Sequence, residues 1–441
     1  MLYIYQEQGN ARSRELRERS HLFAGLTARI GKNSGERGGE GEILTDSVGQ
    51  PSNQINQNNQ SDQINQNNQS DQPHSQSSHP NQANDQATHP DNNYQDYRYT
   101  RYADILADPE YMRDHRIFVR EPSFADEVVL LFGGDILFDP GYAVMAAAIE
   151  RGGTVEDAFC ANLLEMMQSA DIMMLNNEFT YTRRGEPTSG KRFTFRADPS
   201  SAAWLIDMGV DIVSLANNHT FDYGEVSLLD TIEALETHGI NHVGAGRNMS
   251  EASAPVFFIV GDIKIAILAA TQIERLANPD TREATATAPG VMRFMNPARL
   301  LEAVTAAKEV SDFVVVFVHW GTESADQPDW MQIDHAPLIA AAGADLIIGS
   351  HPHVLQGIVR HGNTPIAYSL GDFWFSSRTT DTGLLEVVIN EDGIKTLRFI
   401  PAIQRNCFTS ILLGSEKARV LDIVRNLSPR TRIDEEGYIS W

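Results

Sequence analysis

The chain has 441 residues, of which 41% are hydrophobic, and it carries a formal net charge of −24 from 35 basic and 59 acidic residues. Nucleic acids and anionic membranes bind basic faces, so this charge excludes both as principal partners and favours cation binding. With Cys160 and Cys407 as the only cysteines, a disulfide framework and a thiolate metal cluster are excluded as well.

The first 120 residues predict a mostly disordered region. The nonapeptide QINQNNQSD occurs twice in tandem, at residues 54–62 and 63–71, within a stretch built almost wholly of polar residues. Such an Asn/Gln-rich stretch cannot bury enough apolar surface to offset its ordering entropy. Three histidines in it could bind metal weakly, but a solvated linker is the favoured interpretation: His74, His79 and His89.

The N-terminus lacks the apolar core of a signal peptide, and no run approaches the roughly 18 apolar residues of a membrane helix. We therefore expect a cytoplasmic chain without a transmembrane segment.

The composition changes near Glu127, where short apolar runs begin to alternate with longer amphipathic stretches. The runs are nearly continuous in hydrophobicity, which is typical of strands buried on both faces. Six strands are predicted from them, at residues 127–132, 170–175, 210–215, 312–318, 344–349 and 365–370.

Helices are predicted between these strands, among them residues 225–240 and 297–310. Two further stretches, residues 256–268 and 384–400, predict β-hairpins around short turns, so part of the sheet must be antiparallel. Alternating strands and helices indicate a layered α/β domain. Two packed mixed sheets with helices outside fit better than a doubly wound parallel sheet. We expect the folded domain at residues 127–405 and a C-terminal extension at residues 406–441.

Polar side chains follow each of the six strands at the point where it ends. Ligands of α/β sheets bind outside the carboxyl ends of strands, so these side chains are predicted to meet at one edge. In chain order they are Asp135, Glu178, Asn217, Asn218 and His219, then His319 and Glu323, then His351 and His353, and finally Asp372.

Each of these residues alone has an ordinary explanation, such as a turn, a helix cap or a hydrogen-bonded core histidine. Jointly they are better explained by a metal site. Imidazole, carboxylate and amide ligands suit Zn, Mn, Fe or Co and are poor for Cu(I). In the stretch GSHPHVLQG, two imidazoles flank Pro352, and we expect both on one side of an extended segment.

At these motifs the chain resembles the CapA family, the poly-γ-glutamate and capsule synthesis proteins of the calcineurin-like metallophosphoesterase superfamily. The resemblance runs from Phe132 to Phe375. It rests on the stretches GGDILF, NNEF, SLANNHTFDYG, GINHVGAGR, VHWGTE, GADLIIGSHPHVLQG and YSLGDFWF.

The resemblance implies a four-layer αββα sandwich with two divalent metal ions at its active site. It implies Glu178 as the carboxylate that bridges both ions and His219 as the catalytic histidine, which would protonate the leaving group or hold the anionic substrate. The remaining implied metal ligands are Asp135, Asn218, His319, His351 and His353. Typical members carry Asp-X-His in the first motif, whereas Ile136 and Leu137 follow Asp135 here. Asp372 or Asp139 is expected to compensate, unless only one ion binds tightly.

The resemblance also implies a metal-dependent hydrolase of phosphoester or amide bonds in capsule, poly-γ-glutamate or cell-envelope polymer biosynthesis. Its substrate would be an anionic polymer, a phosphoester or a γ-glutamyl compound, and its setting an envelope synthesis complex. The alternative is a non-catalytic assembly subunit that retains the fold. Basic residues after Glu178 could receive an anionic substrate, or could form an ordinary exposed loop: Arg183, Arg184, Lys191 and Arg192.

Overall fold

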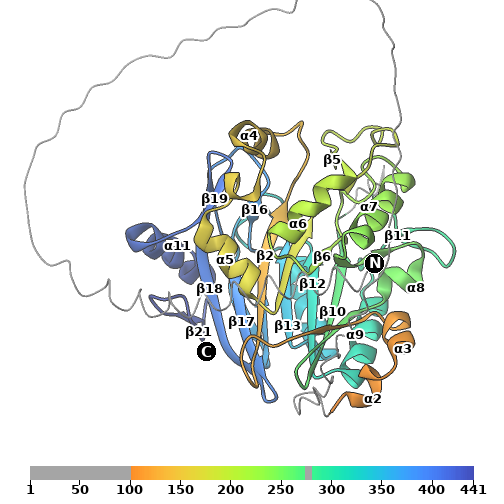
Figure 1. The fold of residues 1–441 in the computed structure, drawn as a ribbon. Coiled ribbons are helices and arrows are strands. Elements are labelled where there is room, and N and C mark those ends of the chain that lie inside the picture. The colour runs from red at the N-terminus through yellow and green to blue at the C-terminus, as the bar shows by residue number, and fades with distance from the viewer. Residues whose placement is uncertain (1–100, 274–280) are drawn as a thin grey trace, which may run out of the picture. The chain divides into compact units, whose positions relative to one another are not determined.

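The structure, a computed structural model, describes residues 101–273 and 281–441, which contain two large mixed β-sheets (Figure 1). The first sheet has the strand order β1 (Ile117–Arg120), β9 (Val256–Val260), β10 (Ile263–Thr271), β12 (Phe313–His319), β13 (Leu346–Ser350), β15 (Thr364–Ala367) and β14 (Ile358–His361). The second has the order β19 (Phe408–Ile411), β18 (Gly393–Arg405), β17 (Thr380–Asn390), β2 (Val128–Ile136), β3 (Ile172–Asn177), β6 (Ile212–Ser214) and β7 (Asn241–Val243), with β16 (Asp372–Trp374) paired to β2.

Helices and short strand pairs connect these strands. The α-helices are α2 (Ala103–Leu106), α3 (Pro109–Asp114), α4 (Ala143–Arg151), α5 (Ala161–Ser169), α6 (Ala203–Asp207), α7 (Glu225–Thr237), α8 (Met249–Ser253), α9 (Ala298–Val310), α10 (Trp330–Ala341) and α11 (Gly414–Leu427). Two 3₁₀ turns span Val155–Asp157 and Pro199–Ala202. The short pairs are β4 (Thr180–Tyr181) with β5 (Arg196–Ala197), β8 (Ala245–Gly246) with β11 (Gly290–Val291), and β20 (Arg432–Ile433) with β21 (Ile439–Ser440).

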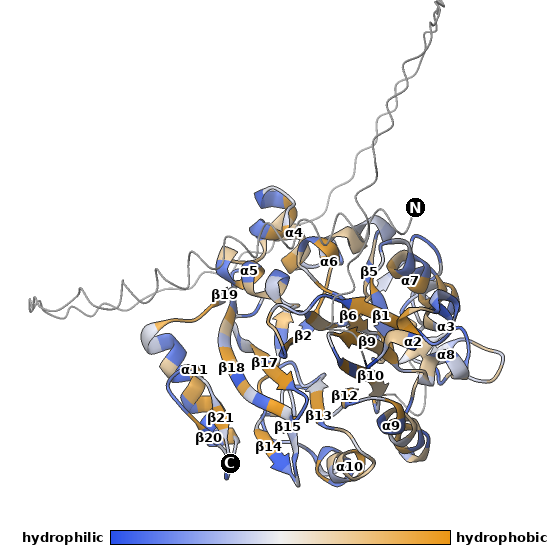
Figure 2. Ribbon diagram, turned by 60° about the horizontal axis from the view of Figure 1, so that its bottom comes forward, coloured by the Kyte–Doolittle hydropathy of each residue, from blue (hydrophilic) through white to orange (hydrophobic). Residues whose placement is uncertain are grey.

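Three buried hydrophobic clusters separate four layers. Successive side chains of a strand point to opposite faces of its sheet. On β2, Leu131 accordingly packs in a cluster with helices α4 to α7, whereas Leu130 and Phe132 pack in the cluster between the two sheets. On β12, Val314 and Val316 join a third cluster, which contains side chains of α8, α9 and α10. Figure 2 shows α9 and α10 on the far side of the sheets from α4, α5 and α6. The predicted αββα sandwich of two mixed sheets is confirmed.

The local predictions hold for the strands and hairpins. All six predicted strands are present, as β2, β3, β6, β12, β13 and β15. The predicted hairpins are the antiparallel pairs β9–β10 and β17–β18. Among the described residues, none of the helices has the length and apolar character needed to cross a membrane.

Ordered elements lie beyond both predicted boundaries of the folded domain. Residues 103–120, assigned above to the N-terminal region, contain two helices and β1, which pairs in parallel with β9 and buries Ile117. Residues 406–441, assigned to an extension, contain β19, which pairs with β18, and α11, which places Val420, Leu421 and Val424 in the cluster between the sheets. The two strands are four residues long and are ordered by pairing with strands that are distant or longer, whereas the amphipathic α11 is held by packing in the cluster between the sheets. The prediction for residues 1–100 lies outside the described residues.

A protein that starts at residue 121 is expected to be less stable than one that starts at residue 101. The shorter form loses the β1–β9 ladder, the buried Ile117 side chain and the ion pair between Arg120 and Asp211. Burial of one such side chain is worth about 1.5–3 kcal/mol, so we expect a difference of at least about 2 kcal/mol. Urea unfolding of both forms measures it, and coincident midpoints would show that β1 contributes nothing.

Candidate metal centre

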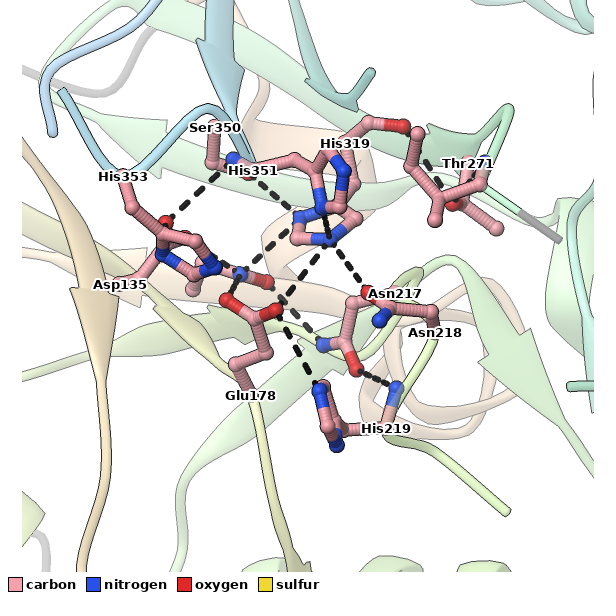
Figure 3. Close-up of polar contacts among 12 residues, drawn as sticks. Asp135, Glu178, Asn217, Asn218, His219, Thr271, His319, Ser350, His351 and His353 are labelled. Atoms are coloured by element: carbon pink, nitrogen blue, oxygen red, sulfur yellow. Dashed lines mark hydrogen bonds and ion pairs between the residues drawn. The ribbon is translucent and has the colours of Figure 1, made fainter. Parts of the chain in front are cut away.

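The structure brings together all seven residues that the sequence analysis assigned to the site (Figure 3). The second sheet supplies residues from the ends of β2 and β3 and from the turn after β6, and the first sheet supplies residues from the ends of β12 and β13. The site therefore spans the carboxyl ends of both sheets. The seven residues are Asp135, Glu178, Asn218, His219, His319, His351 and His353.

Short contacts link these residues into one cluster. The Nε2 atom of His319 lies 2.8 Å from Asn218 Oδ1, 3.0 Å from His351 Nδ1 and 3.4 Å from Glu178 Oε1. Glu178 Oε1 is also 4.0 Å from His219 Nε2, and Asp135 Oδ2 is 3.3 Å from His353 Nδ1. Separations of this size are those of groups that face one common centre. By contrast Glu323, which follows β12 in the sequence, is exposed.

Asp135 reaches the site because two glycines let β2 and β16 approach closely. A Cβ atom on Gly134 would lie 1.8 Å from the carbonyl oxygen of Gly371, so no other residue fits there without backbone movement. The approach places Asp135 opposite Asp372 in the register of β2 and β16. The second glycine of the first motif, Gly134, is thus required by backbone proximity.

His351 and His353 occupy an unusual backbone conformation. Their φ angles are +97° and +60°, in the left-handed region that side chains other than glycine rarely adopt. The extended segment predicted around Pro352 is therefore wrong, although both imidazoles do reach the same centre. Hydrogen bonds hold the turn, from His351 N to Asp135 Oδ2 (3.3 Å) and from Ser324 N to the Pro352 carbonyl (2.8 Å). Such strain persists at functional sites where the surroundings enforce it.

Glu178 supplies the observation that tests whether these residues fit a cation. Its side chain is fully buried, and Oε1 has no hydrogen-bond partner among the described residues, while Oε2 accepts a bond from Asn176 (3.3 Å). Burial, and then the charge of Asp135, raises the pKa of Glu178 well above its usual value. A buried polar atom without a partner costs about 1–3 kcal/mol, and a cation at Oε1 would remove that cost. The residues present therefore fit a divalent cation.

Burial keeps most of the imidazoles neutral. It lowers the pKa of His319 to about 3, and it lowers the pKa values of His351 and His219 as well. A neutral ring is the form that ligates metal. His353 differs, because burial lowers its pKa but the charges of Asp372 and Glu178 outweigh this and hold the pKa well above the usual value. The carboxylates thus concentrate negative potential at His353.

Three groups of side chains place one ligand atom each within 4.8 Å of the others, which is compatible with metal binding. His353 belongs to two of them. The groups are Glu178, His351 and His353; Asp135, His353 and Asp372; and Asp135, Glu178 and His319.

Asp372, one of the two residues named as a replacement for the missing histidine of the first motif, lies beside His353. Its Oδ1 is 2.7 Å from His353 Nδ1, and its Oδ2 accepts a bond from Ser376 (3.2 Å). Asp139, the other residue named for this role, instead accepts bonds from the backbone N–H groups of Gly141 and Arg196.

Two further side chains, which the strand-end pattern did not reveal, orient the centre. Asn176 donates to Asp135 Oδ1 (2.7 Å), and the hydroxyl of Ser350 lies 2.9 Å from His319 Nδ1. Asn176 could have been found, because it is two residues before Glu178 on a strand and so points to the same face. Ser350 carries no such signal, since a serine at a strand end is common.

The basic residues after Glu178 do not form an anion-receiving cluster. Arg183 pairs with Asp198 and Arg184 pairs with Asp230, both at the exposed surface. Lys191 is buried and pairs with Asp222. Arg192 alone of the four is left without a carboxylate partner among the described residues, and its guanidinium lies over the ring of Phe193 (5.0 Å).

Comparison with known proteins adds the family. A family model described as "Bacterial capsule synthesis protein PGA_cap" matches residues 129–377, which include every residue of the site. "Capsule biosynthesis protein CapA" of Bacillus anthracis is 35% identical over 222 residues, 48% of this chain and 53% of that protein. "PGA biosynthesis protein CapA" of Bacillus subtilis (strain 168) is 29% identical over 286 residues, 63% of this chain and 72% of that protein.

A third relative is "Probable polyglutamine synthesis accessory protein Rv0574c" of Mycobacterium tuberculosis (strain ATCC 25618 / H37Rv), 29% identical over 46% of this chain and 55% of that protein. This chain thus spans about half the length of the Bacillus anthracis and Mycobacterium tuberculosis relatives. The family model covers more than half of the chain, and the resemblance inferred from the strand-end motifs is confirmed: the chain belongs to the PGA_cap family of bacterial capsule synthesis proteins.

Proposed function

We propose that this protein is a metal-dependent hydrolase that cleaves a phosphoester or amide bond in the synthesis of a capsule, poly-γ-glutamate or another cell-envelope polymer. One observation carries the proposal. Buried carboxylate, amide and imidazole groups from both sheets meet around Glu178 Oε1, which has no hydrogen-bond partner in residues 101–273 and 281–441. A structural core has no need of such a cluster, because it buries charge at a cost.

The ligand set suits divalent Mn, Zn, Fe or Co. Glu178 would bridge two ions or hold one, and the other ligands would be Asp135, Asn218, His319, His351 and His353, with Asp372 close by. When bound, such ions supply Lewis-acid chemistry, which polarises the scissile bond and activates water.

His219 is the residue placed to move a proton. Its Nδ1 lies 2.7 Å from Asp222 Oδ2, and an ionised carboxylate only accepts hydrogen bonds, so Nδ1 carries a proton in this contact. Nε2 therefore exchanges the second proton and faces Glu178 Oε1 at 4.0 Å. A positioned histidine of this kind serves as general acid for a leaving group.

The names of the relatives refer to capsule, PGA and polyglutamine synthesis, which supports an anionic polymer, a phosphoester or a γ-glutamyl compound as substrate. An envelope synthesis complex is the corresponding partner. Glycerol- or nucleotide-type phosphoesters and γ-glutamyl amides place different charge at the cleaved bond, so a panel of both can separate them.

The test combines metal analysis with a substrate panel. Purified protein is analysed by inductively coupled plasma mass spectrometry, stripped with chelator and reloaded separately with Mn²⁺, Zn²⁺, Fe²⁺ and Co²⁺. Phosphomonoesters, phosphodiesters and γ-glutamyl amides are then assayed. We expect metal-dependent turnover of one class. Bound metal without turnover of any class would favour the alternative, a non-catalytic assembly subunit, and absence of metal binding would overturn the proposal.

A further inference from the structure

A loop segment packs against the turn that carries His219. This segment, residues 188–195, follows β4 and contacts the turn formed by residues 217–223. The backbone N–H of Thr188 donates to the Asp222 carbonyl (2.8 Å), and its hydroxyl donates to the Phe221 carbonyl (2.7 Å). The ring of Phe195 packs on the imidazole of His219, with centroids 4.3 Å apart.

Lys191 is the only charged group that the segment inserts into this contact. Its ammonium lies 2.5 Å from Asp222 Oδ1 and 2.5 Å from the carbonyl oxygen of Asn218. The Lys191 side chain is 5% exposed and that of Asp222 is fully buried. A buried ion pair with good hydrogen bonds is costly to break, because removal of one partner strands the other charge.

The contacts to Asp222 determine how His219 lies. Oδ1 receives the ammonium of Lys191, and Oδ2 receives both the Phe195 N–H (2.6 Å) and His219 Nδ1 (2.7 Å). Because both oxygens of Asp222 accept hydrogen bonds, its carboxylate is held in one orientation. The carboxylate in turn holds the imidazole so that Nε2 faces Glu178.

We propose that Lys191 is a positioning residue, which fixes the Asp222 carboxylate and the Asn218 backbone and thereby sets the orientation of the His219 imidazole. The inference rests on the proposed function for the role of His219. It replaces the interpretation of Lys191 as a receiver of anionic substrate, because both identified bonds of the ammonium go to the protein and the side chain is enclosed.

Lys308 offers a control with the same bonding pattern at a more exposed position, where its side chain is 37% exposed. Its ammonium also binds one carboxylate, that of Asp345 (2.6 Å), and one backbone carbonyl, that of Asp312 (3.0 Å). These residues lie where β12 and β13 begin, at the opposite edge of the sheet from the site. Like Lys191→Met, Lys308→Met therefore removes one positive charge, one bond to a carboxylate and one bond to a backbone carbonyl. It does so without altering any contact of His219.

The first readout does not depend on turnover. In ¹⁵N-resolved imidazole spectra, the His219 Nδ1–H signal is assigned by its absence in His219→Gln. We expect this signal in the unaltered protein and in Lys308→Met, and its shift or loss by solvent exchange in Lys191→Met. An unchanged signal in folded Lys191→Met would overturn the proposal, whether or not the protein proves to be a hydrolase.

The second readout is a double-mutant cycle on kcat. Misplacement of a catalytic group by about 1 Å can cost about 10²-fold, so Lys191→Met should lower kcat by about that factor with little change in KM. In a His219→Gln background the same substitution should have almost no further effect, because Lys191 acts through His219. Full additivity would contradict the proposal.

A second variant covers the case in which Lys191→Met does not fold. Lys191→Arg keeps the charge but enlarges the head group, so it should still shift the Nδ1–H signal of His219. An unshifted signal in Lys191→Arg would count against Lys191 as a positioning residue.

Discussion

His351→Ala is expected to remove bound metal and turnover together. The imidazole of His351 is buried, its Nδ1 lies 3.0 Å from His319 Nε2, and it belongs to a ligand group with Glu178 and His353. Removing a residue that only orients a metal ligand weakens metal affinity by about 10–100-fold. Removing the ligand itself should therefore weaken metal affinity by more than about 10²-fold. Metal titration of the stripped variant measures this directly.

His361→Ala is the matched control for this change. His361 ends β14, is exposed, and lies outside the site, so its removal should leave metal content and turnover unchanged. Because His351 has a positive φ angle, His351→Asn serves as a second variant that tolerates this backbone better. Full metal occupancy in both folded His351 variants would refute its assignment as a ligand.

His219→Ala is expected to keep most of the metal and lose turnover. His219 contributes to none of the three ligand groups, and its Nδ1 is occupied by Asp222. Loss of a positioned general acid typically lowers the rate by about 10²–10⁴-fold. Metal content and kcat, measured on the same sample, check both halves of the expectation.

The leaving group provides the sharper comparison for His219. A substrate whose leaving group departs without a proton, such as a nitrophenyl ester, should lose less rate in His219→Ala than the corresponding alkyl ester. An equal loss for both esters would show that His219 binds the substrate and does not protonate it. If His219→Ala instead strips the metal while His351→Ala keeps it, the two roles have been assigned the wrong way round.

The sequence determined the layers of the fold because the relevant patterns are local. Near-continuous apolar runs predicted strands buried on both faces, and the turns at Gly261 and Gly393 predicted the two hairpins, all of which the structure contains. It also predicted most of the side chains that meet, although Glu323, which was expected among them, is exposed. Residues that follow buried strands reach the same edge of an α/β sheet, and this rule requires no knowledge of the strand order.

The tertiary structure alone decided the outer members of the sheets. β1 is four residues long, and it is held in the first sheet by parallel pairing with β9, which lies more than a hundred residues away in the sequence. The C-terminal β19 and α11 are likewise held by distant partners in β18 and in the cluster between the sheets. A strand of four residues has no periodicity strong enough to reveal such pairing, and the amphipathic pattern of α11 does not show which sheet the helix packs against.

The tertiary structure also decided how each site residue is held. The motif pattern places Asp135, His353 and Asp372 at one sheet edge, and the close approach of β2 and β16 at Gly134 decides that Asp372 Oδ1 lies 2.7 Å from His353 Nδ1. It likewise turns Lys191, which looks like an exposed loop cation in the sequence, into a buried partner of Asp222. Pairings of this kind join residues tens or hundreds of positions apart through backbone proximity and burial. Neither backbone proximity nor burial can be predicted from residue spacing. The sequence therefore determined the chemistry of the site, and the packing of distant segments determined its geometry.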